Sequence, residues 1–151
     1  MEINGYDPAK RYTQEEIDKI GKELEESLAG VLGIKLQPSE GEQVVATMPV
    51  DKRTCRPPGI LNGGASLAMA ETLAGYGSNG ILHAEHTSAF GIQVSANHIA
   101  VAHMGDTVKG VATPVHIGRS THIWDVNITS QTTGKLISSI RVVNFIAHIP
   151  V

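Results

Sequence analysis

The spacing of apolar residues predicts a helix near the start of the chain. Apolar side chains recur at three- and four-residue steps on a mostly charged background, at Ile17, Ile20, Leu24 and Leu28. Thr13-Gln14-Glu15-Glu16 has the pattern of a capping box, in which the first and last side chains bond the free amides of a helix start. We therefore expect a helix that begins after Thr13, packs on one side and stops at Gly30.

A second helix is predicted in the middle of the chain, where apolar residues lose the amphipathic spacing. From Gly63 to about Ser78 the sequence is rich in Ala, Leu and Met and has no proline, which suits a mostly buried helix. Asn79-Gly80 supplies the expected stop.

Alternating apolar and polar residues predict strands in the rest of the chain. A hairpin is expected from Val31–Leu36 and Val44–Val50 around the turn residues Pro38-Ser39-Glu40-Gly41, and Pro57-Pro58-Gly59 breaks the chain before the buried helix. Four further strands are expected at Phe90–Ala96, Thr107–Ile117, Thr121–Thr129 and Leu136–Ile146.

The last three strands are joined by short loops, Gly118-Arg119-Ser120 and Thr132-Thr133-Gly134, so they should run antiparallel. The order helix, two strands, buried helix, four strands predicts an α+β fold in which one antiparallel sheet wraps a central helix. We expect a single domain over residues 1–151, with an N-terminal helical segment at residues 1–30.

Charge, cysteine content and hydropathy argue against several classes of protein for this chain, among them nucleic-acid-binding, disulfide-rich and membrane-spanning proteins. The net charge is −3 and basic residues form no run, so nucleic acid is not an expected partner. The lone Cys55 excludes an internal disulfide, and without a signal peptide the cytoplasm is the expected compartment. No apolar run reaches the roughly 20 residues of a membrane span. Sparse aromatic residues and plentiful glycine and alanine predict a core closed by small residues, an arrangement that often continues into oligomers.

One residue of the predicted buried helix is charged. Glu71 has Leu67, Ala68, Ala74 and Gly75 as its neighbours one turn away. Burying an ionised carboxylate without a partner costs several kcal/mol of folding free energy. Its presence on an apolar helix therefore indicates either a group that offsets this cost or a function that requires the carboxylate. The alternative is that Glu71 reaches the rim of the protein or pairs with an arginine.

Gly63 and Gly64 lie at the start of the same helix. Unpaired amides and the positive end of the helix dipole favour developing negative charge there, and glycine allows a ligand to approach closely. A carboxylate two turns later would suit acid/base or nucleophilic catalysis beside an oxyanion hole.

The motif around these residues resembles a known family. Met48-Pro49-Val50-Asp51-Lys52-Arg53-Thr54, then Gly59-Ile60-Leu61-Asn62-Gly63-Gly64-Ala65-Ser66 and Ala70-Glu71, is similar to hotdog-fold thioesterases of the phenylacetic-acid and dihydroxynaphthoyl-CoA type. The similarity continues through Val94–His98, Val115–Ser120, Trp124 and Gly134–Arg141, and covers roughly Val31 to Ile146.

The resemblance implies roles for several residues. In that family the helix glutamate attacks the thioester carbonyl or activates water, and the first glycine donates its amide to the carbonyl oxygen; here these are Glu71 and Gly63. It also implies a site between two subunits, tetramers built from such dimers, acyl-CoA as substrate and no cofactor or metal. His98 aligns with a histidine near the ligand, and the turn at Arg119, Ser120 and Thr121 with a position close to CoA.

Three supporting positions depart from the family pattern. Asn62 replaces a histidine and can orient a carbonyl but carry no proton, Arg56 replaces a glutamine or asparagine, and Gly75 replaces a hydroxyl residue. Arg56 could hold Glu71 ionised or bind a substrate carboxylate. With Gly64 at the helix start, these residues complete the expected substrate site.

Other residues have simpler interpretations as alternatives. His98 could be a packed strand histidine, and the Arg119 turn a solvated hairpin tip. His83 and His86 have a metal-compatible spacing but are interpreted as a surface loop, and Cys55 as a free thiol whose pKa Arg56 could depress. Arg141, among apolar neighbours, should need a phosphate or a carboxylate across a subunit interface.

The sequence thus predicts an acyl-CoA thioesterase, with an aromatic acyl group as one expected substrate. The alternative function is an acyl-CoA binding or sensing protein that kept the fold and lost turnover, which the changes at Arg56, Asn62 and Gly75 motivate. A dehydratase of the same fold is disfavoured, because no aspartate and histidine pair is placed for that reaction.

Overall fold

The N-terminal helix begins where the sequence predicts. The computed structural model describes residues 12–39, 42–82 and 86–149. Helix α1 (Gln14–Leu24) has the full capping box: Glu16 N–H donates to Thr13 Oγ1 at 3.2 Å, and Thr13 N–H donates to the Glu16 carboxylate at 2.8 Å. Ile17 and Leu24 are buried, as their spacing predicts.

The predicted end of this helix at Gly30 is wrong. Helix α1 ends at Leu24, and a separate short helix, α2 (Leu28–Val31), contains Gly30. Ser27 interrupts the first helix because its hydroxyl accepts a hydrogen bond from Gly30 N–H and so caps the second. The change of direction leaves Leu28 66% exposed, although the three- and four-residue spacing placed it on the packed face.

One six-stranded antiparallel sheet forms the body of the protein. Its strand order is β1-β2-β6-β7-β8-β5. The predicted hairpin of β1 and β2 is present, but its first strand begins at Lys35 and not at Val31, which belongs to α2. Glu40-Gly41 of its turn lies outside the described residues. The strands are β1 (Lys35–Gln37), β2 (Val44–Pro49), β5 (Thr87–His98), β6 (Thr107–Ile117), β7 (Thr121–Ser130) and β8 (Leu136–His148).

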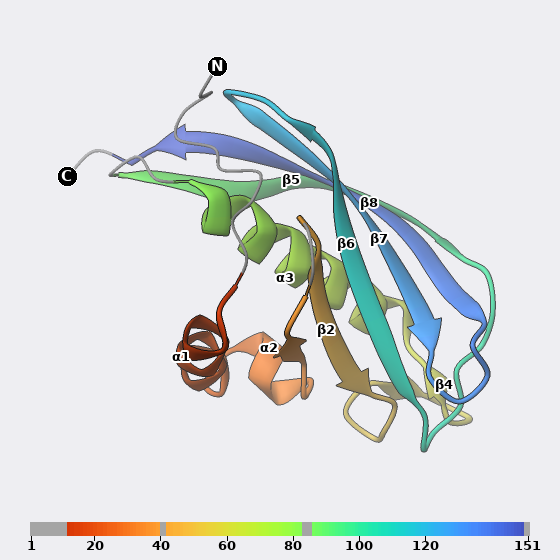
Figure 1. Ribbon diagram of the computed structural model, residues 1–151. Coiled ribbons are helices and arrows are strands. Elements are labelled where there is room, and N and C mark those ends of the chain that lie inside the picture. The colour runs from red at the N-terminus through yellow and green to blue at the C-terminus, as the bar shows by residue number, and fades with distance from the viewer. Residues whose placement is uncertain (1–11, 40–41, 83–85, 150–151) are drawn as a thin grey trace.

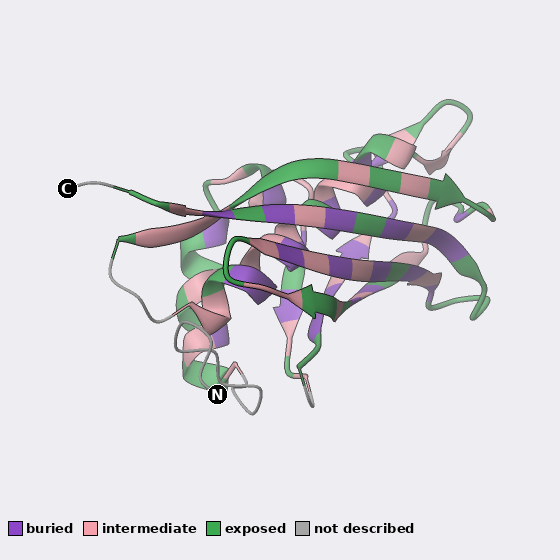
Figure 2. Ribbon diagram, turned by 90° about the horizontal axis from the view of Figure 1, so that it is seen from above, coloured by how far each residue is buried: buried purple, intermediate pink, exposed green. Residues whose placement is uncertain are grey.

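The sheet curves around the long helix α3 (Gly63–Ile81), as Figure 1 shows. Buried and more exposed residues alternate along β7 and β8, so one face of these strands packs on α3 and the other faces outward (Figure 2). This is the α+β arrangement, a sheet wrapped around a central helix, that the sequence predicts. No helix among the described residues is long and apolar enough to cross a membrane.

Helix α3 continues past its predicted stop at Asn79-Gly80 and ends at Ile81. Gly80 has a different role from the one expected: an added Cβ would overlap the phenol of Tyr12, so this glycine makes room for a packed ring rather than a turn. The Tyr12 hydroxyl donates to the Tyr76 carbonyl and ties the start of the described chain to α3.

The core closes through small residues, as the composition predicts. An added Cβ on Gly77 would lie 2.6 Å from the ring of Trp124, which is 1% exposed. Across the helix, an added Cβ on Gly110 of β6 would lie 2.8 Å from Met69 and Leu73. These glycines let the helix and the sheet approach closely.

A small second sheet precedes α3 and was not predicted. Strands β3 (Cys55–Arg56) and β4 (Ile60–Leu61) pair antiparallel around the turn at Pro57-Pro58-Gly59. Gly59 has φ +107°, a conformation that L side chains rarely adopt. The turn residues that were expected to break the chain therefore build a short hairpin that leads directly into Asn62.

Candidate active site

The N-terminus of α3 is held by its own cap. The side chain of Asn62 accepts a hydrogen bond from Gly64 N–H at 2.8 Å, and the backbone N–H of Asn62 donates to the Thr54 carbonyl at 2.8 Å. The Gly63 amide is one of the first-turn groups for which the helix has no acceptor. Asn62 thus orients the glycine amides, and its amide nitrogen still provides donors.

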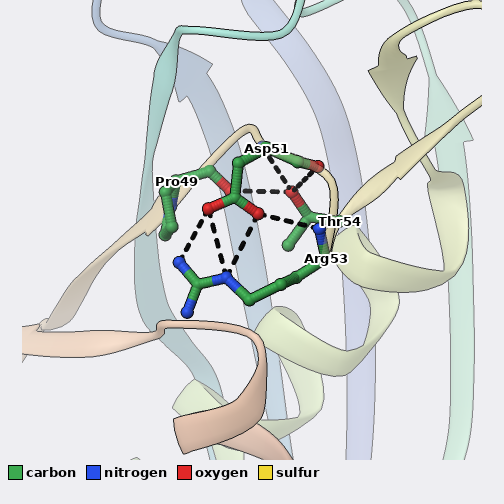
Figure 3. A network of polar contacts seen from close by, with 4 residues as sticks. All are labelled: Pro49, Asp51, Arg53 and Thr54. Carbon is green, nitrogen blue, oxygen red and sulfur yellow. Dashed lines mark hydrogen bonds and ion pairs between the residues drawn. The ribbon is translucent and has the colours of Figure 1, made fainter.

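The loop between β2 and β3 fixes the position of this cap (Figure 3). Thr54 is buried, its hydroxyl donates to the Pro49 carbonyl at 2.8 Å, and it accepts from Asp51 N–H at 3.1 Å. Arg53 pairs with Asp51 at 2.7 Å, and its hydrogen bonds hold the pKa of that carboxyl below its usual value. Because the Thr54 carbonyl receives the Asn62 amide, this loop sets the place of the glycine amides.

His98 lies against Gly63, at the end of β5. An added Cβ on Gly63 would lie 2.7 Å from Nε2 of His98, so a larger residue would displace the imidazole. The other ring nitrogen, Nδ1, is 2.8 Å from the hydroxyl of the buried Ser138. The structure therefore brings His98 together with Gly63. Position 63 requires glycine because the imidazole of His98 approaches its backbone closely.

Glu71 lies two turns further along α3, on the face beside β5. An added Cβ on Gly91 of β5 would lie 3.1 Å from the Glu71 carboxylate, which shows how closely the two elements approach. The side chain is exposed in the single chain. Of the two interpretations, the one in which Glu71 reaches the rim of the protein therefore holds for one chain, in which β5 is the edge strand of the sheet.

One chain does not bring Glu71 to the glycine amides. Glu71 lies eight positions after Gly63, which corresponds to about 12 Å along a helix axis. The guanidinium of Arg56 donates to the Pro57 carbonyl at 3.0 Å and, within the described part of the chain, forms no ion pair with Glu71. The ion pair with Glu71, one of the interpretations of Arg56, is thus not formed in one chain.

The Arg119 turn lies toward the other end of α3. Gly118 N–H donates to the Thr121 carbonyl and Ile146 N–H to the Ser120 carbonyl, both at 2.9 Å. The next residue, His122, bonds Ser78 near the C-terminal end of the helix at 3.0 Å. Arg119, Ser120 and Thr121 are therefore separated from Gly63 by most of the length of α3.

Glu71 and Gly75 share a cleft of about 420 Å³ that sequence reasoning missed. The cleft lies between α3 and the segment from Leu24 to Ala29. Leu28 is part of its lining, whereas its helical spacing predicted a side chain packed in the core.

Two expectations about other residues are wrong. Arg141 pairs with Asp125 of the neighbouring strand at 2.7 Å in the same chain, on the outward face, and therefore does not need a phosphate or a second subunit. The pKa of the Cys55 thiol is raised, first by partial burial and then by the charge of Asp51, whereas Arg56 was expected to lower it.

Among the residues that the structure describes, no three His, Cys, Asp or Glu side chains gather as a metal site would need. His83 lies outside the described residues, and His86 is an exposed turn residue.

Comparison with known proteins finds thioesterases and esterases that are similar to this chain. The family model described as "Thioesterase superfamily" matches residues 58–137. ComA2 of Bacillus subtilis is 41% identical over 109 residues, which are 72% of this chain and 86% of that protein. The 1,4-dihydroxy-2-naphthoyl-CoA hydrolase of Escherichia coli is 33% identical over 87% of this chain and 93% of the relative.

A solved structure extends the similarity to three dimensions. A variant of thioesterase PA1618 from Pseudomonas aeruginosa superposes with a TM-score of 0.84 and 31% identity, covering 91% of this chain and 97% of that one.

Proposed function

The chain belongs to the thioesterase superfamily, and on this premise we propose that it hydrolyses acyl-CoA thioesters with Glu71 as its catalytic carboxylate and Gly63 as oxyanion donor. The observation that carries the proposal is α3 itself: its first amides are oriented by Asn62, and its carboxylate lies exposed beside a cleft. Positively polarised amides and a carboxylate are the two groups that thioester hydrolysis requires.

The site is completed by a second copy of the chain. Glu71 and Gly63 are too far apart in one subunit, but two helices that lie antiparallel would place Glu71 of each subunit near Gly63 of the other. The edge of β5 supports this arrangement: strand β5 carries no charged residue, and its Ile92 is 61% exposed. Long uncharged edge strands are templates for pairing.

Further contacts follow from this dimer. His98 accompanies Gly63 and contacts the substrate beside the carbonyl, while Arg56 and Gly64 border the same helix start. The turn at Arg119, Ser120 and Thr121 offers a guanidinium and hydroxyls for a CoA phosphate. Phe90 and Phe145 are register partners on the outer sheet face, 49% and 44% exposed, and support the pairing of dimers into a tetramer. We place the enzyme in the cytoplasm.

The reaction proceeds at the carbonyl carbon. The Glu71 carboxylate either attacks this carbon directly, giving an anhydride that water then cleaves, or takes a proton from the attacking water. The Gly63 amide stabilises the oxygen as it becomes negative, and the carbon–sulfur bond breaks. The products are the free acid and the CoA thiol. Incorporation of labelled water oxygen into Glu71 in a single turnover distinguishes the two routes.

The test is the release of thiol from acyl-CoA by a Glu71→Gln variant. We expect kcat to fall by about 10²–10⁴-fold, because the uncharged amide can neither attack nor accept a proton. Melting temperature should stay unchanged, since Glu71 is exposed. Glu15→Gln, at an exposed glutamate of α1 away from the cleft, is the matched control and should leave kcat unchanged.

Two outcomes would contradict the proposal. An unchanged rate in Glu71→Gln would remove Glu71 from the mechanism. A parent protein that binds acyl-CoA tightly without releasing thiol would be a binding or sensing protein instead.

A further inference from the structure

His98 and Ser138 form a hydrogen-bonded pair on neighbouring strands of the sheet. They are register partners on β5 and β8, so their side chains lie on the same face. The Ser138 side chain is fully buried, and its Oγ lies 2.8 Å from Nδ1 of His98. A buried hydroxyl thus holds one nitrogen of a ring whose other nitrogen lies against the start of α3.

The burial of Ser138 decides which atom of this hydrogen bond is the donor. In the parts of the chain that the structure describes, His98 is the one group that bonds the Ser138 hydroxyl. If Nδ1–H were the donor, the hydroxyl hydrogen would have no acceptor there, and a buried donor without an acceptor costs about 1–3 kcal/mol. The hydroxyl therefore donates to Nδ1. A neutral imidazole that accepts at Nδ1 carries its hydrogen on Nε2.

Nε2 is the ring atom of His98 that points at Gly63. The position of an added Cβ on Gly63 lies 2.7 Å from Nε2, but 3.1 Å from Cε1 and 3.2 Å from Cδ2. The ring therefore faces the start of α3 with this nitrogen first. Among the described residues no group accepts a hydrogen bond from Nε2, so its N–H is available beside the Gly63 amide.

From this geometry we propose that Ser138 is a positioning residue for thioester hydrolysis: it holds His98 so that Nε2–H is a second hydrogen-bond donor to the carbonyl oxygen, beside the Gly63 amide. The inference rests on the proposed thioesterase function and adds a residue to its mechanism. Two donors stabilise the oxygen better than one as it becomes negative. The opposite tautomer would present the lone pair of Nε2 to the same oxygen and repel it.

The tautomer of His98 in the parent protein is the first test, because it requires no change to Ser138. Long-range proton–nitrogen NMR of protein with isotope-labelled histidine distinguishes a protonated ring nitrogen from an unprotonated one. At about pH 8, where an ordinary imidazole is neutral, we expect hydrogen on Nε2 and none on Nδ1. The signals of His98 are assigned by their loss in His98→Ala. Hydrogen on Nδ1 would overturn the inference.

Kinetics test whether Ser138 acts through His98. The substrate is the ester that the parent hydrolyses fastest among acetyl-CoA, octanoyl-CoA and benzoyl-CoA. Ser138→Ala should lower kcat by roughly 10–100-fold and leave KM within about threefold, because an oxyanion donor acts in the transition state. In the His98→Ala background the same substitution should change kcat by less than about twofold, since no ring remains to be positioned. A serine that only supports the fold would cause the same loss in both backgrounds, which would contradict the proposal.

The next residue of β8 provides the matched control. Ser139 is half-buried and has the opposite orientation on the strand, so Ser139→Ala should leave kcat and KM unchanged. Ser138→Thr keeps the hydroxyl and suits a strand, so it should retain kcat within about threefold of the parent value. Equal losses in Ser139→Ala and Ser138→Ala, or a folded Ser138→Thr protein as slow as Ser138→Ala, would count against the inference.

The outcomes separate the inference from the proposed function. A parent protein that releases thiol but carries hydrogen on Nδ1 of His98 would overturn the inference alone. A parent protein that releases no thiol from any of the three esters would overturn the proposed function and this inference with it.

Discussion

The two sides of α3 differ in how their polar groups are satisfied. On the side toward β7 and β8, Ser78 is fully buried: its hydroxyl oxygen accepts from Trp124 Nε1 and Asn144 Nδ2, both at 2.9 Å, and lies 3.0 Å from Nδ1 of His122. On the other side, Glu71 is exposed, and Gly75 borders open space.

The two sides of the helix therefore serve different purposes: one side stabilises the fold, and the other is available for binding. Buried polar groups that are fully bonded specify how the sheet packs on the helix, and removing one partner leaves the others unsatisfied. An exposed carboxylate beside an open cleft contributes little to the fold of one chain, but it is available to a substrate. Substitutions on the inner side should therefore change stability, and those on the outer side activity.

The largest expected effect on stability is that of Ser78→Ala. Three buried groups, on Trp124, Asn144 and His122, would lose a partner, and we expect the free energy of unfolding to fall by about 3–5 kcal/mol. Urea denaturation measures this change. Thr72→Ala is the control, because its hydroxyl bonds the Ala68 carbonyl of its own helix, and it should cost less than about 1 kcal/mol. Equal costs would remove the proposed contrast between the two sides.

The second effect is loss of stability in acid. Burial lowers the pKa of His122 from 6.5 to about 4, although a backbone hydrogen bond to Gly118 opposes the shift. Between these values the unfolded chain binds the proton and the folded chain does not, so stability is fully present above pH 6.5 and falls as the pH drops toward 4. The loss should approach roughly 3 kcal/mol, measured by urea denaturation across this range.

His122→Gln is the check on this assignment. The variant should be less stable than the parent at pH 7 but should show a flatter pH dependence between 6.5 and 4. A variant that keeps the full slope would show that other groups cause it. Asp51 and Asp106, whose pKa values are lowered by their hydrogen bonds, contribute at lower pH.

Much of this fold follows from local pattern. Strand β6 was predicted at its observed bounds, and β7 and β8 within two residues, because alternation and short loops act over a few neighbouring positions. The family resemblance identified Glu71 and Gly63 as candidates and implied a site between two subunits, and their spacing along one helix already keeps them apart in one chain.

The misses share a physical cause: periodicity reports which side a residue faces but not what covers that side. Leu28 has the right spacing for the core, yet Ser27 caps a new helix and turns it outward. The Ser78 hydrogen-bond network joins α3 to strands more than 40 residues away. The sequence contained one indication of this network: Asn144 is a polar residue on the same inward side of β8 as Val142 and Ile146, so it needs a buried hydrogen-bond partner.

The two glycines Gly75 and Gly77 provide the smallest and most direct comparison, because they lie two residues apart on the same helix. An added Cβ at Gly77 would lie 2.6 Å from the buried Trp124 ring, so Gly77→Ala should cost about 1–3 kcal/mol. Gly75→Ala should instead stabilise the protein by about 0.5–1 kcal/mol, because alanine favours the helix and meets nothing. Thermal and urea denaturation of the two variants measure the difference. Changes of the same sign would mean that the space beside Gly75 is closed in solution, for example by the second subunit, and opposite signs would establish that the cleft beside Glu71 is open.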